Sequence, residues 1–253
     1  MSDQRLLLSR RGLFGGLASA GGLLLTGCGE QLPPTYGNIL RMGDNLTYTM
    51  QRALFSPTGL AREYDRSDIS SMPATGTYDP SRADGGLYDP AQGPDYARLH
   101  KGDFADWRLQ VEGSVARPGS FSLADLQRMH RRTQITRHMC EEGWTAIAEW
   151  TGVPVRSVLE AVGIKPSARY VEFHTFDLMA NSLDMIDALH PQTILAYGMN
   201  GRNLPIGHGA PLRLRVERQI GYKSVKFLRK IVVTDVFRDT GDIKSGWAWY
   251  NGI

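Results

Sequence analysis

Short strand-like runs in the second half of the chain constrain its fold more than any other feature. Apolar and β-branched residues gather in four such runs, at residues 170–176, 194–199, 212–216 and 230–234. The Asn200-Gly201 pair that follows the second run predicts a tight hairpin turn. The regular alternation of strands and helices that a doubly wound parallel sheet needs is missing. The sequence therefore predicts a mixed α+β domain with a strand-rich core and short helices.

Helix and strand signals also precede these runs. Residues 107–111 alternate apolar and polar side chains, as a half-buried strand does. Ser122 and Asp125 form a capping pair that predicts a short helix. Residues 155–162 place their apolar side chains on one helical face, and Gly163 follows them. We expect two short helices between the strands.

The composition limits the class of protein. Of the 253 residues, 42% are hydrophobic and 22% are charged, which is typical of a globular protein with one main domain and extensions. The formal net charge of +3 is small and the basic residues are spread along the chain, so no nucleic-acid partner is expected. With only two cysteines, Cys28 and Cys140, a disulfide framework is not expected either.

The first residues resemble an export signal. Arg10 and Arg11 precede an apolar, glycine-rich run at residues 12–25, which is too short for a comfortable membrane span. The paired arginines indicate the twin-arginine route, which exports proteins already folded and is typical of proteins that acquire a cofactor before export. The sequence from Leu25 to Cys28 resembles a lipobox, in which Cys28 is acylated; the alternative is a plain cleaved signal.

These signals divide the chain into four parts. We expect a twin-arginine-type signal with a lipobox at residues 1–28 and an irregular extension, rich in Pro, Gly and Asp, at residues 29–105. A short helix is possible at residues 50–60, where Pro57 would end it early. The main domain is expected at residues 106–238 and a tail at residues 239–253. The destination is the periplasm or the cell-envelope face, with a lipid anchor.

Cys140 is the main candidate for chemistry. It is expected between a strand and an irregular segment, where its side chain can face a cleft, and Arg137 and His138 could stabilise its thiolate. The alternative is a buried thiol that acts as a small core residue. No second cysteine or close histidine pair completes a metal site made of protein alone, so zinc is not expected.

Three segments resemble the sulfite oxidase-like molybdopterin-dependent oxidoreductases. The first, at residues 140–154, is similar to the cysteine segment of that family, and residues 208–213 and 221–226 are similar to its two cofactor-phosphate segments. The similarity covers about residues 106–235. Within the family, the chain most resembles the exported catalytic subunits of periplasmic methionine sulfoxide reductases and not the larger sulfite oxidases.

The resemblance implies one molybdenum-molybdopterin cofactor per chain, with the sulfur of Cys140 bound to molybdenum. It also implies a pterin contact from Thr175 and a set of residues at the cofactor phosphate, namely His208, Arg213, Ser224, Val225 and Lys226. Independently of the family, a buried phosphate needs charge-assisted donors, which a guanidinium and an ammonium supply. For Arg213 and Lys226 the alternative is a solvated basic strand face.

Residues beside Cys140 and in the extension are also assigned roles. Glu142 is two places after the ligand, where a reductase of this family also has an acidic residue, and could pass protons to the site; the alternative is a surface carboxylate. Trp144 and Trp150 are expected in the core. In the extension, where the similarity is loose, Asp68 or Ser70 is expected near the pterin.

The function expected from this resemblance is oxygen-atom transfer, with reduction of a sulfoxide or a similar S- or N-oxide favoured. The chain has no Cys-x-x-Cys-His segment for covalent haem, so electrons are expected from a separate partner, a membrane haem protein or a cytochrome. Oxidation of sulfite is the alternative reaction, for which Arg66 could meet the anionic substrate. The alternative from another class is a cofactor-free lipoprotein that binds an anion or a partner protein.

Overall fold

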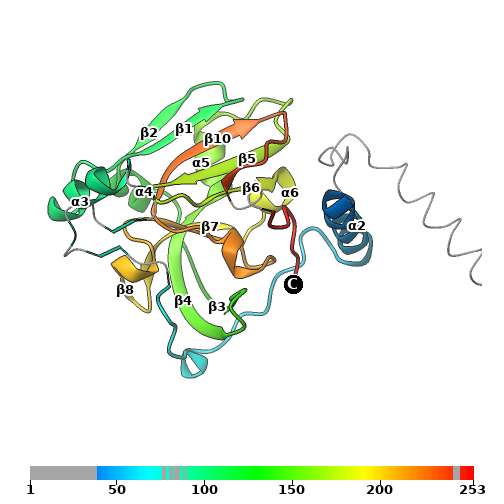
Figure 1. Cartoon of the computed structure of the whole chain (residues 1–253), viewed down its shortest axis with the longest axis horizontal. Helices are drawn as coiled ribbons and strands as arrows, with labels where there is room; N and C mark the ends of the chain where they lie inside the picture. The colour runs from blue at the N-terminus through cyan, green and yellow to red at the C-terminus, as the bar shows by residue number, and fades with distance from the viewer. Residues whose placement is uncertain are drawn as a thin grey trace, which may run out of the picture.

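Figure 1 shows the computed structural model of the chain, which describes residues 39–75, 78–79, 82, 86–87, 89, 91–241 and 246–253. One sheet holds five strands in the order β2 (Gly119–Phe121), β1 (Leu109–Gly113), β10 (Leu228–Thr234), β5 (Tyr170–Thr175) and β6 (Ala180–Asp184) within this described part. The β1–β10 pair is parallel and the other neighbours are antiparallel.

The second sheet carries the long β3–β4 hairpin. Its strands are β3 (Arg132–Met139), β4 (Thr145–Pro154), β7 (Ile194–Met199) and β8 (Arg202–Asn203), and β9 (Arg213–Arg215) also pairs with β7. Asn200 and Gly201 join β7 to β8 with φ angles of 51° and 74°. Positive φ at both positions is what the tightest hairpin turn requires, so the predicted turn is confirmed.

Short helices lie between the strands, as predicted. Helix α4 (Leu123–Arg128) begins with a capping box between Ser122 and Asp125. Helix α5 (Val155–Val162) ends at Gly163, whose φ is 71°, and its buried side chains join the main core with those of β1, β5 and β10. Helix α6 (Met185–Ala188) follows β6. The α+β class with a strand-rich core is confirmed.

The extension is more regular than the sequence suggested. Helix α2 (Ile39–Leu54) begins and ends earlier than the short helix expected at residues 50–60, because its apolar residues already recur at helical spacing from Ile39. A 3-10 helix, η1 (Arg66–Asp68), and helix α3 (Gly93–Lys101) follow. Tyr96 and Leu99 of α3 belong to the main core. Part of the extension therefore packs as an integral piece of the domain.

The tail packs against α2. Trp249 and Tyr250 form a small buried cluster with Tyr48 of that helix, with ring centroids 5.1 and 5.0 Å from the Tyr48 ring. Figure 1 shows α2 beside the C-terminus, at the edge of the domain. Among the described helices, none combines the length and the apolar character needed to cross a bilayer. The expected export signal and Cys28 lie outside the described residues.

Candidate active site

The turn between β3 and β4 presents Cys140 to a cleft. The Cys140 backbone N–H donates to the carbonyl of Trp144 over 2.9 Å, and the Gly143 N–H donates to the carbonyl of Cys140 over 3.1 Å. Gly143 has a φ of 89°, which favours glycine and lets the chain reverse at this point. The thiol is half-buried and the neighbouring Glu141 and Glu142 side chains are exposed. The hairpin thus holds a thiol at the cleft wall with two carboxylates beside it.

Trp144 lines this cleft, so its expected place in the core is wrong. Its indole N–H donates to a Glu142 carboxylate oxygen over 2.8 Å, and its ring lies 5.5 Å from that of His138. Trp144 lies in the turn between the end of β3 at Met139 and the start of β4 at Thr145, and it is half-buried. Trp150, in the middle of β4, is fully buried as expected. Trp144 instead fixes the direction of the Glu142 carboxylate.

Basic residues form the other wall. Arg213 on β9 is buried and donates to the carbonyls of His208 and Ser224 over 3.1 and 2.7 Å. Lys226 donates through Nζ to the carbonyls of Thr75 and Gly207. The cleft, of about 200 Å³, collects Cys140 and Glu142 together with five of the expected phosphate-site residues, His208, Arg213, Ser224, Val225 and Lys226. The alternative of a solvated basic strand face does not apply to Arg213.

Two glycines allow the walls to approach each other. A Cβ on Gly209, which follows the 3-10 helix η2 (Ile206–His208), would lie 2.6 Å from the Lys226 Cβ. A Cβ on Gly221, in the 3-10 helix η3 (Gly221–Lys223), would lie 2.8 Å from the His138 ring. Both distances are well inside van der Waals contact, so only glycine permits this packing. The two basic segments therefore close against Lys226 and against the end of β3.

Burial and mutual repulsion disfavour the charged forms of the basic side chains in this wall. Burial and repulsion from Arg213 lower the pKa of Lys226 to about 8. Burial and repulsion from Arg213 and Lys226 lower the pKa of His208 to about 4. Burial and the neighbouring Arg215 lower the pKa of Arg213 to about 9. The shifts share a cause, because each charge is desolvated near others of the same sign. An anionic group in the cleft would offset this repulsion.

On balance, the surroundings of Cys140 disfavour its thiolate. Burial, together with Glu141 and Glu142, raises the pKa of the thiol. Arg137 lies over the Tyr64 ring at 5.3 Å. Burial, with repulsion from Arg215, lowers the pKa of His138 to about 2, so this ring is neutral. The expectation that Arg137 and His138 stabilise the thiolate is wrong, and deprotonation would have to accompany metal binding.

The residues present suit a cofactor with a soft metal and a phosphate. The buried Nδ1 atom of His208 has no hydrogen-bond partner in the described chain, although this residue lines the cleft. Buried polar atoms are normally satisfied, so this nitrogen is open to a ligand. A thiol suits a soft metal, and His208, Arg213 and Lys226 suit a phosphate. The donor set fits both parts of the implied cofactor.

Three expected cofactor contacts do not line the cleft. The Thr175 hydroxyl is buried and bonds to Asp177 and Met179, so it supports the turn that carries those two lining residues. Asp68 is exposed and accepts from the Asp65 N–H over 3.0 Å, and the Ser70 hydroxyl accepts from the Ile147 N–H over 3.0 Å. The segment that carries Asp68 and Ser70 runs along the β3–β4 hairpin. It reaches the cleft only at the later residues 72–75.

Other lining residues were missed by the sequence reasoning. The extension contributes Met72, Pro73 and Thr75, a few residues beyond the segment that was singled out. The turn after β5 contributes Asp177, whose pKa burial raises to about 6. Tyr222 was inside a recognised segment and received no role. Only Tyr222 had a signal in the sequence, because the others reach the cleft through long-range packing of irregular segments.

Comparison with known proteins decides the family. Residues 96–240 match the family described as "Oxidoreductase molybdopterin binding domain". This chain belongs to that family. It is a molybdopterin-binding oxidoreductase, and its family implies a molybdenum cofactor. The matched range takes in the hairpin with Cys140 and all the basic segments of the cleft.

Relatives extend over most of the chain. A protein of Azospira oryzae, named as the YedZ1 subunit of a protein-methionine-sulfoxide reductase, is 33% identical over 98% of this chain and 87% of its own length. The protein-methionine-sulfoxide reductase catalytic subunit MsrP of Xanthomonas campestris is 29% identical over 95% of this chain and 74% of its own. The crystal structure of the sulfane dehydrogenase SoxCD from Paracoccus pantotrophus covers 51% of this chain and 38% of that chain, with 27% identity and a TM-score of 0.49.

Proposed function

We propose that this protein is an exported oxidoreductase that reduces a sulfoxide, with the Cys140 thiolate as its protein ligand to molybdenum. One observation carries the proposal: a single cleft contains the thiol of Cys140 and the buried basic residues His208, Arg213 and Lys226. When bound, the molybdenum cofactor supplies two-electron redox chemistry with oxygen-atom transfer. The basic residues would hold its phosphate through charge-assisted hydrogen bonds.

Glu142 is proposed to deliver protons. Reduction of a sulfoxide to a thioether consumes two electrons and two protons and releases one water. The Glu142 side chain is exposed, so its carboxylate exchanges protons with solvent, and the indole of Trp144 holds one of its oxygens at 2.8 Å. A positioned carboxylate at the cleft can carry a proton to the leaving oxygen. Its role is general-acid catalysis.

The carboxylates beside Cys140 favour a neutral oxide over sulfite. Two exposed carboxylates, Glu141 and Glu142, flank Cys140. They would repel an incoming anion, whereas a sulfoxide is uncharged. Arg66, the residue considered for an anionic substrate, is paired instead with Glu149 at 2.5 Å. The names of the relatives, which are protein-methionine-sulfoxide reductases, point to methionine sulfoxide as the substrate class.

A separate protein is proposed to supply the electrons. The sequence has no covalent haem motif, and the relatives are named as subunits or catalytic subunits, which implies a further component. We place the mature chain on the periplasmic or cell-envelope side, because of the paired arginines and the apolar run at residues 12–25. Acylation of Cys28 would anchor it to the membrane that holds a haem-containing electron donor.

Metal and pterin content provide the first test. We would express the wild type with its signal in a host that makes the cofactor, next to Cys140→Ser. Near-stoichiometric molybdenum and pterin are expected in the wild type, and loss of the metal-centred redox signal in the variant. Cys28→Ala is the matched control, because it removes the other cysteine and should keep the metal. A folded wild type that holds neither metal nor pterin would favour the cofactor-free lipoprotein.

Substrate assays provide the second test. With an artificial electron donor, the loaded enzyme should reduce methionine sulfoxide, and with an artificial acceptor it should oxidise sulfite poorly. Glu142→Gln should lower kcat by about 10²-fold or more and leave the metal content unchanged, because it removes the proton donor alone. Faster oxidation of sulfite than reduction of sulfoxide would overturn the proposed direction.

A further inference from the structure

Helix α2 turns its polar face toward the domain. Arg52 pairs with Asp184 and Asp187, each at 3.0 Å, and the indole N–H of Trp249 donates to Asn45 over 3.0 Å. Arg41, at the other end of the helix, pairs with Asp239 of the tail. These contacts tie both ends of the helix to different parts of the protein. Its orientation is therefore fixed by buried polar groups.

The opposite face of α2 is apolar and exposed. Five side chains at spacings of three or four residues form what we call the outer stripe, and between 41% and 81% of each is exposed: Ile39, Met42, Leu46, Met50 and Leu54. The charged residues of the helix are Arg41, Asp44 and Arg52, and none of them is exposed. An amphipathic helix normally buries such a stripe against its own domain. Here the polarity is inverted, which marks an interaction surface.

Trp247 extends the outer stripe toward the active site. This residue, 44% exposed, lines a surface hollow together with Ile39 and Leu40 of α2 and with the paired Arg41 and Asp44 at its base. Its ring lies 4.9 Å from that of Tyr222, which lines the cleft with Cys140. A partly exposed tryptophan beside an aliphatic stripe is typical of proteins that sit at a membrane–water interface. The stripe and the cleft are thus joined through one pair of aromatic rings.

We propose that the outer stripe and Trp247 lie on the lipid bilayer, so that the cleft opens beside the membrane surface. The uncharged exposed face favours lipid over a charged partner protein. Ile39 follows Cys28 by eleven residues, so an acyl chain on Cys28 would keep the helix within about 40 Å of the bilayer. The inference goes beyond the proposed function and shares with it only the acylation of Cys28.

Quenching of Trp247 by lipid tests this directly. Full-length wild type and Cys28→Ala would be mixed with phosphatidylcholine vesicles that carry brominated acyl chains, and Trp247→Phe would identify the signal of this tryptophan. We expect Trp247 to be quenched in both proteins and the quenching to persist at high salt, because the exposed face of α2 carries no charge. A tether alone would bind the protein to vesicles and leave Trp247 unquenched, which would overturn the proposal.

Substitutions in the stripe supply the matched comparison. Leu46→Gln with Met50→Gln removes apolar surface without adding charge and should reduce vesicle partitioning of the Cys28→Ala protein by about tenfold or more. Leu46→Met with Met50→Leu keeps the apolar surface and should bind as the starting protein does. Equal binding by the glutamine variant would overturn the proposal. A dimer that depends on the stripe, with no vesicle binding, would also overturn it in favour of a second copy.

Discussion

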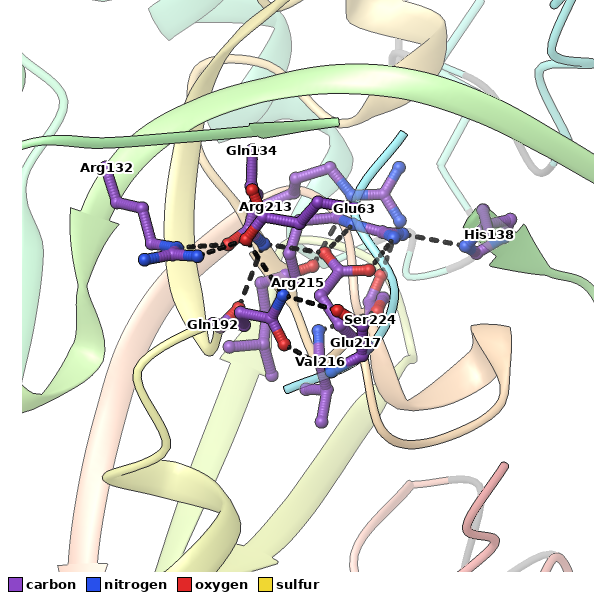
Figure 2. A network of polar contacts seen from close by, with 12 residues as sticks. Glu63, Arg132, Gln134, His138, Gln192, Arg213, Arg215, Val216, Glu217 and Ser224 are labelled. Carbon is purple, nitrogen blue, oxygen red and sulfur yellow. Dashed lines mark hydrogen bonds and ion pairs between the residues drawn. The ribbon is translucent and has the colours of Figure 1, made fainter. Parts of the chain in front are cut away.

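Two arginines on one short strand show how differently this protein treats buried charge. Arg213 and Arg215 are alternate residues of β9, so they point to the same face, and both lie over the Trp150 ring, at 5.1 and 4.5 Å. Arg215 pairs with Glu217 at 2.7 Å and contacts His138 (Figure 2). The hydrogen bonds described for Arg213 run to carbonyl oxygens only. One charge is compensated within the fold and the other faces the cleft.

The different partners of Arg213 and Arg215 distinguish a charge that stabilises the fold from a charge that is available to bind a ligand. A buried ion pair that also satisfies its hydrogen bonds can be maintained by the fold alone. A buried guanidinium whose partners are neutral keeps much of its desolvation cost until an anion arrives. We therefore expect Arg215 to serve the scaffold and Arg213 to serve the ligand site. Removing the partner of Arg215 should mainly lower the stability of the protein. Removing Arg213 should mainly lower its retention of the cofactor.

The largest effect on stability is expected for Glu217→Gln. This change leaves the buried Arg215 without its carboxylate, and removing one member of a buried pair costs about 3–5 kcal/mol. Urea denaturation of the cofactor-free protein would measure the free energy of unfolding. A loss below about 1 kcal/mol, the size expected for an exposed pair, would mean that Arg215 is no more compensated than Arg213.

Arg213→Gln should act mainly on the cofactor. Loss of one charge-assisted contact costs about 1.5–3 kcal/mol of binding, or about tenfold to a hundredfold in affinity. The free energy of unfolding of the cofactor-free protein should fall less than in Glu217→Gln, because a desolvated charge is removed together with its contacts. Pterin content and urea denaturation check the two parts. Full pterin content in Arg213→Gln would remove this residue from the site.

The pH dependence of stability sharpens the same contrast. The pKa of His208 is about 4 in the folded chain, lowered by burial and by Arg213 and Lys226 from an ordinary value near 6.5. Between these values the unfolded chain binds more protons at this residue, so the contribution of His208 to the free energy of unfolding should fall as pH decreases from about 6.5 to about 4. His190, whose pKa burial also lowers to about 4, contributes with the same sign.

Thermal unfolding of the cofactor-free protein across this range measures the slope. His208→Gln should make it shallower without abolishing it, and inorganic pyrophosphate should raise Tm in the wild type more than in Arg213→Gln. A slope unchanged by His208→Gln would show that this imidazole is not held neutral by the basic wall.

The smallest effect is expected for an ion pair at the surface. Lys230 and Glu112 approach to 3.2 Å on neighbouring strands, and both are substantially exposed. Glu112→Gln should cost at most about 1 kcal/mol in urea denaturation, because water screens the pair. This value sets the baseline for the buried pair. A cost as large as that of Glu217→Gln would mean that burial does not account for the difference.

The sequence predicted what local patterns determine. Residues 155–162 and 194–199 carry their own periodicity, and both became the expected helix and strand. Cys140, His208 and Lys226 could be selected because they lie in recognisable segments, and the structure brings them to one cleft. Their roles stay predictions until the variants are measured.

The predictions that were wrong or missing concern residues whose positions depend on contacts between distant segments. No sequence pattern near Thr75 predicts that its carbonyl accepts a hydrogen bond from Lys226, 151 residues away. Thr175 was expected at the pterin, and its hydroxyl instead serves the turn beside it. The outer face of α2 had helical spacing, but its unusual orientation follows from Asp184, Asp187 and the tail. Burial of this kind is decided by packing and cannot be derived from periodicity alone.

The position of β10 has a consequence for how the molecule forms. This strand lies between β1 and β5, in the interior of its sheet, although it is the last of the described strands along the chain. Its pairing with β1 joins Gln110 to Lys230 across more than a hundred residues, and such distant pairings are slow to form. During synthesis, β1 stays without its parallel neighbour until residues 228–234 have been made. The nascent protein therefore completes this sheet only after more than a hundred residues have followed β1.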